Sequence, residues 1–167
     1  IGYDLYVKIL NDAVLEEKGE APAPKFESKV DVNIDAYLPE KYIKSESQRM
    51  DIYKKIAHIE CAADLDDLAD ELQDRFGEIP RQADTLMYVS LARSLASQAR
   101  IPTISQKGQI ISIIPEQFDP VKWAEASARA NIRLTFQMVG RGCVNYKVKD
   151  SRPLYDVCSL LENYLEV

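Results

Sequence analysis

The segment IPTISQKGQIISII, residues 101–114, decides the fold class, because the apolar period of the chain changes there. Residues 103–105 and 109–114 are rich in β-branched side chains and flank Gln106-Lys107-Gly108, which is a compact turn signal. They predict a β-hairpin. Before this segment the apolar residues recur at helical spacing. The chain therefore combines helices with antiparallel strands, and we predict an α+β fold.

Upstream of the hairpin, the pattern predicts one strand followed by three helices. Residues 30–34 alternate between apolar and acidic or amide side chains, as in a half-buried strand. Residues 45–59, 64–76 and 81–100 each carry an apolar stripe at helical spacing. Gly77 follows the second of these helices and is a typical stop signal. We expect these helices to form one layer of the domain.

Downstream of the hairpin, the pattern predicts a helix, a second hairpin and a last helix. Asp119 and Pro120 are a typical N-cap and first-turn pair, so we expect a helix to about Ala128. Alternation over 132–136 and 144–148 predicts two further strands. Either Asp150 or Ser151 is expected to cap the final helix. The sheet then has about five strands and is mostly antiparallel.

The N-terminal part of the chain is expected to lie outside this domain. Residues 1–20 show helical spacing and no initiator Met, so we interpret them as the end of a preceding region in a longer protein. Residues 21–28 contain two prolines and no apolar period, and they predict a flexible linker. Residues 29–167 are then the α+β domain.

Composition excludes several classes of function. The 27 acidic and 21 basic residues give a net charge of −6, which disfavours a dedicated nucleic-acid-binding domain. Three cysteines without a C-x-x-C pair argue against a disulfide framework and a zinc knuckle, and favour a reducing, cytoplasmic setting. The single histidine, His58, leaves too few ligands for a His-based metal site. We expect neither a metal nor a cofactor.

Catalytic motifs are also missing from the sequence. It contains no phosphate-binding loop, no dinucleotide fingerprint and no nucleophile elbow. His58 and Cys61 are three residues apart, and on one helix they could form a minimal Cys-His nucleophile pair. The turn Gly140-Arg141-Gly142 is better explained as a hairpin loop than as a phosphate nest, since no helix follows it.

The helix predicted over residues 64–76 is unusually acidic. Residues 60–78 hold eight acidic residues and one basic residue. Asp64, Asp66 and Asp67 lie in the predicted first turn, where the helix dipole favours acids. Asp70, Glu71 and Asp74 lie in the second half, where the dipole disfavours them. Like charges four residues apart, such as Asp70 and Asp74, add repulsion. Two interpretations stay open, a solvated face and a docking surface for an arginine-bearing partner.

Three stretches together resemble the C-terminal domain of the bacterial transcription-repair coupling factor (Mfd) family. The first two are the opening IGYDLY of residues 1–6 and the strand VNIDAYLP of residues 32–39. The third is Arg49 with YKKI of residues 53–56, followed by ELQDRFGEIP of residues 71–80, and it is the most specific. From Gln106 onward the similarity lies in the order of elements.

This resemblance implies a regulatory, non-catalytic domain of an ATP-dependent translocase. Proteins of that family bind stalled RNA polymerase, move on double-stranded DNA and recruit the repair protein UvrA through an N-terminal UvrB-like module. The C-terminal domain folds back on that module, masks its UvrA-binding face and restrains the motor. The family's docking acids match Glu71 and Asp74, and the docking surface that we predict consists of Asp67, Asp70, Glu71, Asp74 and Arg75.

Three classes of function therefore remain open. The first is an intramolecular autoinhibitory clamp. The second is a module that itself binds UvrA or RNA polymerase. The third is a stand-alone enzyme that uses Cys61 and His58. We expect the chain to be monomeric.

Overall fold

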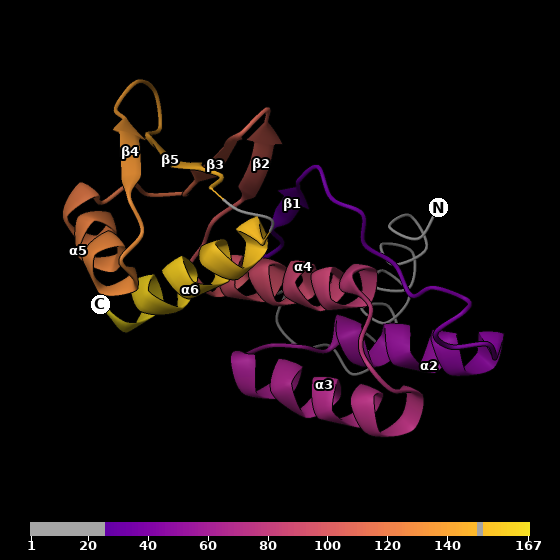
Figure 1. Cartoon of the computed structure of the whole chain (residues 1–167). Coiled ribbons are helices and arrows are strands. Elements are labelled where there is room, and N and C mark those ends of the chain that lie inside the picture. The colour runs from indigo at the N-terminus through magenta and orange to yellow at the C-terminus, as the bar shows by residue number, and fades with distance from the viewer. Residues whose placement is uncertain (1–25, 150–151) are drawn as a thin grey trace. The chain divides into compact units, whose positions relative to one another are not determined.

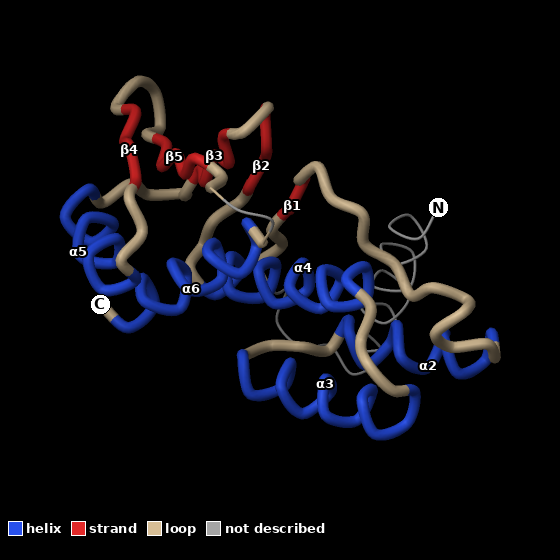
Figure 2. Tube along the Cα trace, in the orientation of Figure 1, coloured by secondary structure: helices blue, strands red, loops and turns tan. Residues whose placement is uncertain are grey.

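The computed structural model describes residues 26–149 and 152–167, which fall into two compact units. The first unit contains residues 34–91, and the second contains residues 26–33 together with 92–167. The described residues form five helices and one five-stranded mixed sheet, which confirms the α+β prediction (Figures 1 and 2). The helix expected over residues 1–20 and residues 21–25 of the expected linker lie outside the described residues.

The first unit is built from helices α2 and α3 and the N-terminal part of α4. These helices span Glu46–Ala57, Ala62–Phe76 and Arg81–Gln98, so the three predicted helices are confirmed with small shifts at their ends. Ser45 caps α2 by accepting a hydrogen bond from the Gln48 backbone N–H at 3.3 Å. The side chains that α2 and α3 bury are Ile52, Tyr53, Ile56, Leu65, Leu68 and Leu72.

The extended segment before α2 is tied to the helices of the first unit by polar contacts. The backbone N–H of Leu38 donates to the Tyr53 hydroxyl at 2.9 Å, and the N–H of Tyr37 donates to the Gln82 carbonyl at 3.3 Å. Burial raises the pKa of Tyr53, so its hydroxyl stays protonated at neutral pH. These bonds satisfy backbone donors that have no partner in a helix or strand.

The second unit contains the sheet, whose strand order is β1-β2-β3-β5-β4. β1 and β2 are parallel, whereas the other three neighbouring pairs are antiparallel. The prediction of a mostly antiparallel sheet of about five strands is therefore confirmed. The strands span Lys29–Asp31, Thr103–Lys107, Ile110–Ile114, Leu134–Gln137 and Cys143–Lys147.

The first strand is shorter than alternation over residues 30–34 predicts. β1 ends at Asp31, the last residue that pairs with β2. The backbone N–H of Asn33 donates instead to the Gln106 side-chain Oε1 at 2.9 Å. Alternating polarity indicates which side chains are buried, but a strand also needs a neighbouring backbone with which to pair. At Asn33 the side chain of Gln106 takes the place of that backbone partner. At the other end, Ser28 is buried and donates to the Ile101 carbonyl at 2.5 Å.

The turn of the first hairpin is also tighter than expected. Gln106 and Lys107 continue β2 by pairing with β3, so only Gly108 and Gln109 form the turn. Gly108 has a φ of +61°, which is the left-handed conformation that two-residue hairpin turns require.

The core of the second unit contains apolar side chains from the sheet and from helices α5 and α6. These helices span Pro120–Ala130 and Pro153–Glu166 and pack against each other. The ring of Trp123, which is fully buried, stacks on Tyr164 with centroids 4.0 Å apart. As predicted, Asp119 caps α5 by accepting from the N–H groups of its first turn. The caps predicted for α6, Asp150 and Ser151, lie outside the described residues.

Candidate protein-docking surface

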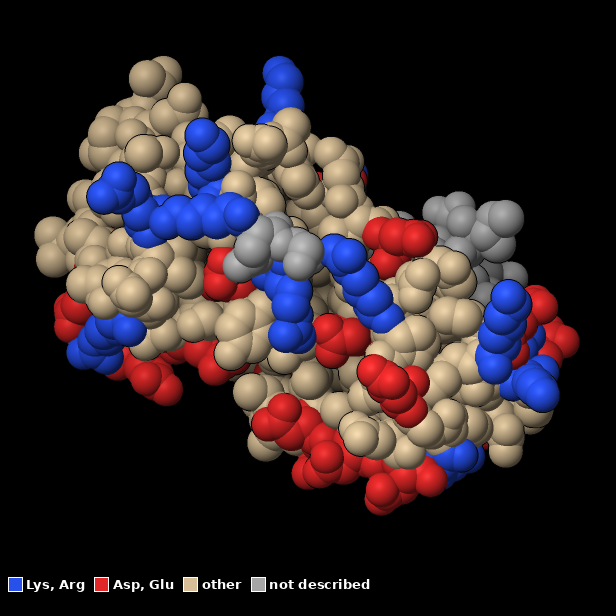
Figure 3. All heavy atoms as spheres, in the orientation of Figure 1, with Lys and Arg blue, Asp and Glu red and all other residues tan. Residues whose placement is uncertain are grey.

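Helix α3 separates apolar and acidic side chains on opposite sides. Leu65, Leu68 and Leu72 are buried on one side. Asp67, Asp70 and Asp74 follow one another at intervals of three and four residues, which places them in one row on the opposite side. All three are exposed, and acidic side chains gather over α3 in Figure 3. We call these three aspartates the acidic face.

The acidic face has no counter-charge within the described part of the chain. None of its three carboxylates makes a hydrogen bond or an ion pair with a described residue. Asp70 and Asp74 are four residues apart, so they repel each other by about 0.2–0.5 kcal/mol. The described residues therefore contain no partner that explains the row of aspartates.

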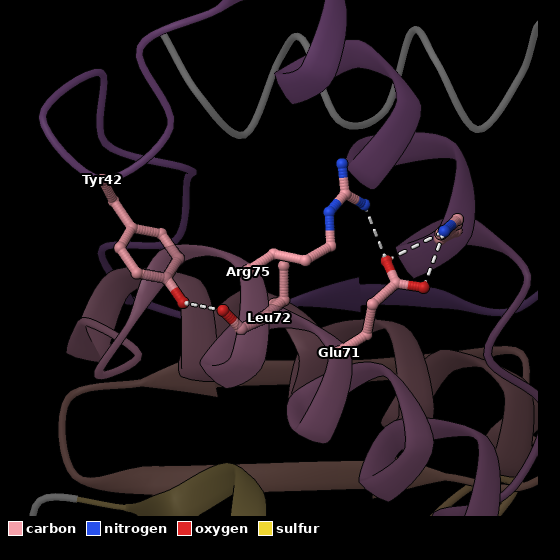
Figure 4. A network of polar contacts seen from close by, with 5 residues as sticks. Tyr42, Glu71, Leu72 and Arg75 are labelled. Atoms are coloured by element: carbon pink, nitrogen blue, oxygen red, sulfur yellow. Dashed lines mark hydrogen bonds and ion pairs between the residues drawn. The ribbon is translucent and has the colours of Figure 1, made fainter.

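Glu71 differs from the acidic face, because it has two partners. Lys55 of α2 donates to both of its carboxylate oxygens at 2.8 Å, and Arg75 donates to one of them at 3.0 Å (Figure 4). The hydrogen bond from the Lys55 ammonium is the main cause of a lowered pKa of Glu71, and Arg75 lowers it further. The sequence analysis found only unfavourable charges around Glu71, and the structure corrects this, because Lys55 and Arg75 pair with it. Lys55 lies sixteen residues away in sequence, so no local pattern indicates the pair.

Arg75 contacts both an acidic and an aromatic side chain. Besides its ion pair with Glu71, its guanidinium lies 4.9 Å from the centroid of the Phe76 ring, within the range of a cation-π contact. Its position in the last turn of α3 also suits the helix dipole. Of the predicted docking set, the structure therefore joins Glu71 and Arg75 in a network with Lys55 and leaves the acidic face unpartnered.

The C-terminal end of α3 is closed by a residue that sequence reasoning missed. The Tyr42 hydroxyl lies 3.1 Å from the Leu72 carbonyl oxygen (Figure 4). It also lies 2.9 Å from the carbonyl oxygen of Gly77, so it can donate to either acceptor. Gly77, which the sequence did indicate, ends the helix with a φ of +88°. Burial raises the pKa of Tyr42. Tyr42 was not predictable, because thirty residues separate it from Leu72.

The N-terminal end of α3 lies two residues earlier than predicted. The helix begins at Ala62, so Asp64 is in its first turn but Asp66 and Asp67 are not. The dipole explanation given for these three acids therefore holds only for Asp64, since the dipole effect fades beyond the first turn. The Asp64 carboxylate accepts the Glu60 backbone N–H at 3.0 Å, and this bond lowers the pKa of Asp64.

The structure contradicts the helical spacing assumed for a Cys-His pair. His58 is the C-cap of α2 and Cys61 is the N-cap of α3, so the two do not lie on one helix. Cys158 is buried, and burial raises the pKa of its thiol well above the usual range. Among the described residues, no group of three His, Cys, Asp or Glu side chains could hold a metal ion.

Two other sequence expectations can be compared with the structure. Gly140 and Gly142 have positive φ values and belong to the loop between β4 and β5, which confirms a hairpin loop. In the part of the chain that the structure describes, no helix is both long and apolar enough to cross a membrane.

Comparison with known proteins shows the class of domain to which this chain belongs. Residues 32–125 match the family model described as the TRCF domain. This match covers more than half of the chain, so the chain belongs to the TRCF domain family. The fold of the described residues and the surface of α3 are thus those of a member of this family.

The individual relatives are transcription-repair-coupling factors. The factor of Bacillus subtilis (strain 168) is 31% identical over 159 residues, which is 90% of this chain and 13% of that protein. A factor of Staphylococcus epidermidis (strain RP62A) is 40% identical over 118 residues, which is 68% of this chain and 10% of that protein. The chain therefore spans about an eighth or less of the curated relatives' length.

A solved structure has the same fold. The crystal structure of the C-terminal domain of transcription-repair coupling factor matches with a TM-score of 0.76 and 27% identity, covering 84% of this chain and 92% of that chain. The resemblance seen in the sequence is confirmed. The chain is placed with the C-terminal domains of factors that couple transcription to DNA repair.

Proposed function

We propose that this chain is a non-catalytic, autoinhibitory domain that docks through α3 on an N-terminal UvrB-like module of a transcription-repair coupling factor. Docking would mask the surface of that module that recruits UvrA. The observation that supports this proposal is the acidic face, whose three exposed carboxylates have no partner among the described residues. Family membership supports the identity of the partner.

The contacts around Glu71 suit a docking role for the neighbouring acids. Lys55 and Arg75 form ion pairs with Glu71, and the pair with Lys55 joins α3 to α2. The backbone of α3 keeps the three aspartates of the acidic face in one row. A fixed row of carboxylates favours arginine, whose guanidinium pairs with carboxylates in a bidentate way. Binding a cationic partner also relieves the repulsion between Asp70 and Asp74, which gives docking a direct energetic reason.

In this proposal the domain regulates a motor that lies elsewhere in the coupling factor. That motor would be an ATP-dependent translocase on double-stranded DNA that binds RNA polymerase in the bacterial cytoplasm. The domain itself would act as a monomer, without a cofactor, and would hold ATP turnover low until docking is released. A clamp of this kind needs only a few kcal/mol to keep a domain that is tethered to its target mostly closed.

The experiment reverses two charges of the acidic face in a full-length coupling factor that carries this domain. Asp70→Lys with Asp74→Lys leaves the Glu71 network intact, so folding should be preserved. We expect tighter UvrA binding and higher ATP turnover in the absence of polymerase. Glu40→Lys with Asp51→Lys is the matched control, because both residues are exposed in the same unit and the charge change is equal.

The outcomes separate the proposed clamp from a direct binding module. Unchanged UvrA affinity and unchanged ATP turnover in the folded variant refute the clamp. Weaker binding of UvrA or RNA polymerase in the variant favours the alternative that the domain itself contacts them. A pull-down of the 167-residue chain by the separately expressed UvrB-like module tests the partner directly, and the Asp70/Asp74 variant should fail to bind it.

A further inference from the structure

Strand β4 is an edge strand whose outer side is open. The strand order places it last in the sheet, next to β5 (Figure 2). Among the described residues, no backbone hydrogen bond other than the β4–β5 ladder involves residues 133–139. An edge strand presents unpaired N–H and C=O groups, which can pair with an added strand. The backbone of β4 is therefore available for strand addition.

The hairpin that contains β4 carries only positive charge. Residues 133–149, which we call the basic hairpin, include four cations and no acidic residue. The cations are Arg133, Arg141, Lys147 and Lys149. All four are exposed, and none forms an ion pair with another described residue. By contrast Arg129, just before the hairpin, pairs with Glu125 at 2.8 Å. Within the described part of the chain, the four cations of the basic hairpin thus have no paired counter-charge.

The tip of the basic hairpin is apolar and exposed. Met138 is 66% exposed and Val139 is 91% exposed. The strands next to this tip are anchored, because the Phe118 and Phe136 ring centroids are 5.6 Å apart and the Phe118 side chain lies against Gly142. Charged residues alone would be typical of a protected edge. Two adjacent exposed apolar side chains at the end of that edge are instead typical of a contact surface.

We propose that β4 binds an extended acidic peptide segment of a partner protein as an additional strand. The backbone edge supplies hydrogen bonds, the cations attract acidic side chains, and Met138 and Val139 supply apolar contact. This surface lies in the second unit and has the opposite charge to the acidic face. The inference therefore goes beyond the proposed function and does not depend on it.

Charge argues against two other occupants. Pairing with β4 of a second copy would bring Arg133 and Arg141 close to the same cations of that copy, and like charges repel across paired strands. Single-stranded nucleic acid would need aromatic side chains on which bases stack. In the basic hairpin the Tyr146 ring is buried and Phe136 packs against Phe118.

The test uses the whole 167-residue chain and a labelled peptide of about ten residues with alternating Glu and Val, which matches the period of a strand. Fluorescence anisotropy measures binding, and amide hydrogen exchange reports on β4. We expect the peptide to bind, to protect amides within residues 133–139, and to bind about tenfold more weakly to Arg133→Glu with Arg141→Glu.

A matched control and two further measurements, oligonucleotide binding and sedimentation, make the proposal falsifiable. Lys44→Glu with Lys54→Glu changes net charge equally on exposed residues of the first unit and should alter affinity less than about twofold, since neither residue belongs to the basic hairpin. Absence of peptide binding, binding without protection of β4, or an equal loss in the control overturns the proposal. So does tighter binding of a single-stranded oligonucleotide, or self-association in sedimentation.

Discussion

The role assigned to Glu71 changes once its partners in the structure are known. In the sequence it is one of eight acids in a short acidic segment. In the structure it is 33% exposed and is paired with both Lys55 and Arg75. Its role is therefore to join α3 to α2, whereas the neighbouring aspartates remain without described partners. Reversing its charge would place a third cation beside two others, so we expect Glu71→Lys to destabilise the domain rather than stabilise it.

The lowered pKa of Glu71 predicts how stability depends on pH. Its pKa in the folded state lies below the unfolded value of about 4.5, so its contribution is present above that pH and is lost as pH falls through the folded-state value. We expect Glu71→Gln to lower the free energy of unfolding by about 0.2–1 kcal/mol near neutral pH, because the pairs with Lys55 and Arg75 are partly exposed to solvent. Urea unfolding at decreasing pH should show this difference shrink as the Glu71 carboxylate becomes protonated.

Asp70→Asn is the control for this prediction, because Asp70 has no partner among the described residues. Removing its charge also removes repulsion from Asp74, so its stability should be unchanged or slightly higher at neutral pH. A loss of stability in Asp70→Asn as large as that in Glu71→Gln would contradict the assignment of Glu71 as the paired acid.

The β2–β3 and β4–β5 hairpins each need a glycine, but not for the same reasons. Gly142 has a φ of +84°, and a Cβ at this position would lie 2.6 Å from the Phe118 Cγ. Gly108, in the other hairpin, has a φ of +61°, but a Cβ there would meet no atom within 4 Å. Both glycines are needed for backbone conformation, but only Gly142 is also needed for close packing.

This difference predicts unequal effects of alanine in the two hairpins. We expect Gly108→Ala to cost about 1–2 kcal/mol, the strain of a left-handed alanine. Gly142→Ala should cost about 1–3 kcal/mol more, because Phe118 must also move. Urea unfolding of the two variants measures this. Equal costs would mean that Phe118 moves aside freely and does not anchor the hairpin.

Charge is distributed unevenly over the molecule. Residues 34–91 contain thirteen acidic and seven basic residues, whereas residues 26–33 and 92–167 contain nine acidic and eleven basic residues. The net charge of −6 therefore comes mainly from the first unit. The first unit is acidic and the second is slightly basic. We accordingly propose a cationic partner for the acidic face of the first unit and an acidic partner for the basic hairpin of the second.

The same distribution predicts weak binding to DNA. The basic hairpin offers four cations without described partners, so the slope of log affinity against log salt should be about 4 or less in magnitude. Binding of a duplex measured by anisotropy should be detectable only at low salt and should disappear near about 0.2 M salt. Binding that persists at this salt concentration would indicate a DNA surface that the charge analysis does not predict.

Much of the fold could be predicted from local patterns. The helices, the two hairpins, the Asp119 cap and the Gly77 stop depend on residues within a few positions of one another, and local sequence records such dependence directly. The acidic character of α3 is equally local. Family membership was also detectable, because the motif over residues 71–80 is contiguous.

Contacts between distant residues decided the remainder. The end of β1 depends on Gln106, the closure of α3 on Tyr42, and the role of Glu71 on Lys55. Each of these pairs joins residues that are 16 to 73 positions apart. Periodicity describes which side of an element is buried, but it does not record which side chain of another element meets it. The amino-acid sequence therefore determined the fold class. Which acids of α3 are paired and which are not was decided only by the tertiary structure, because their partners are distant in sequence.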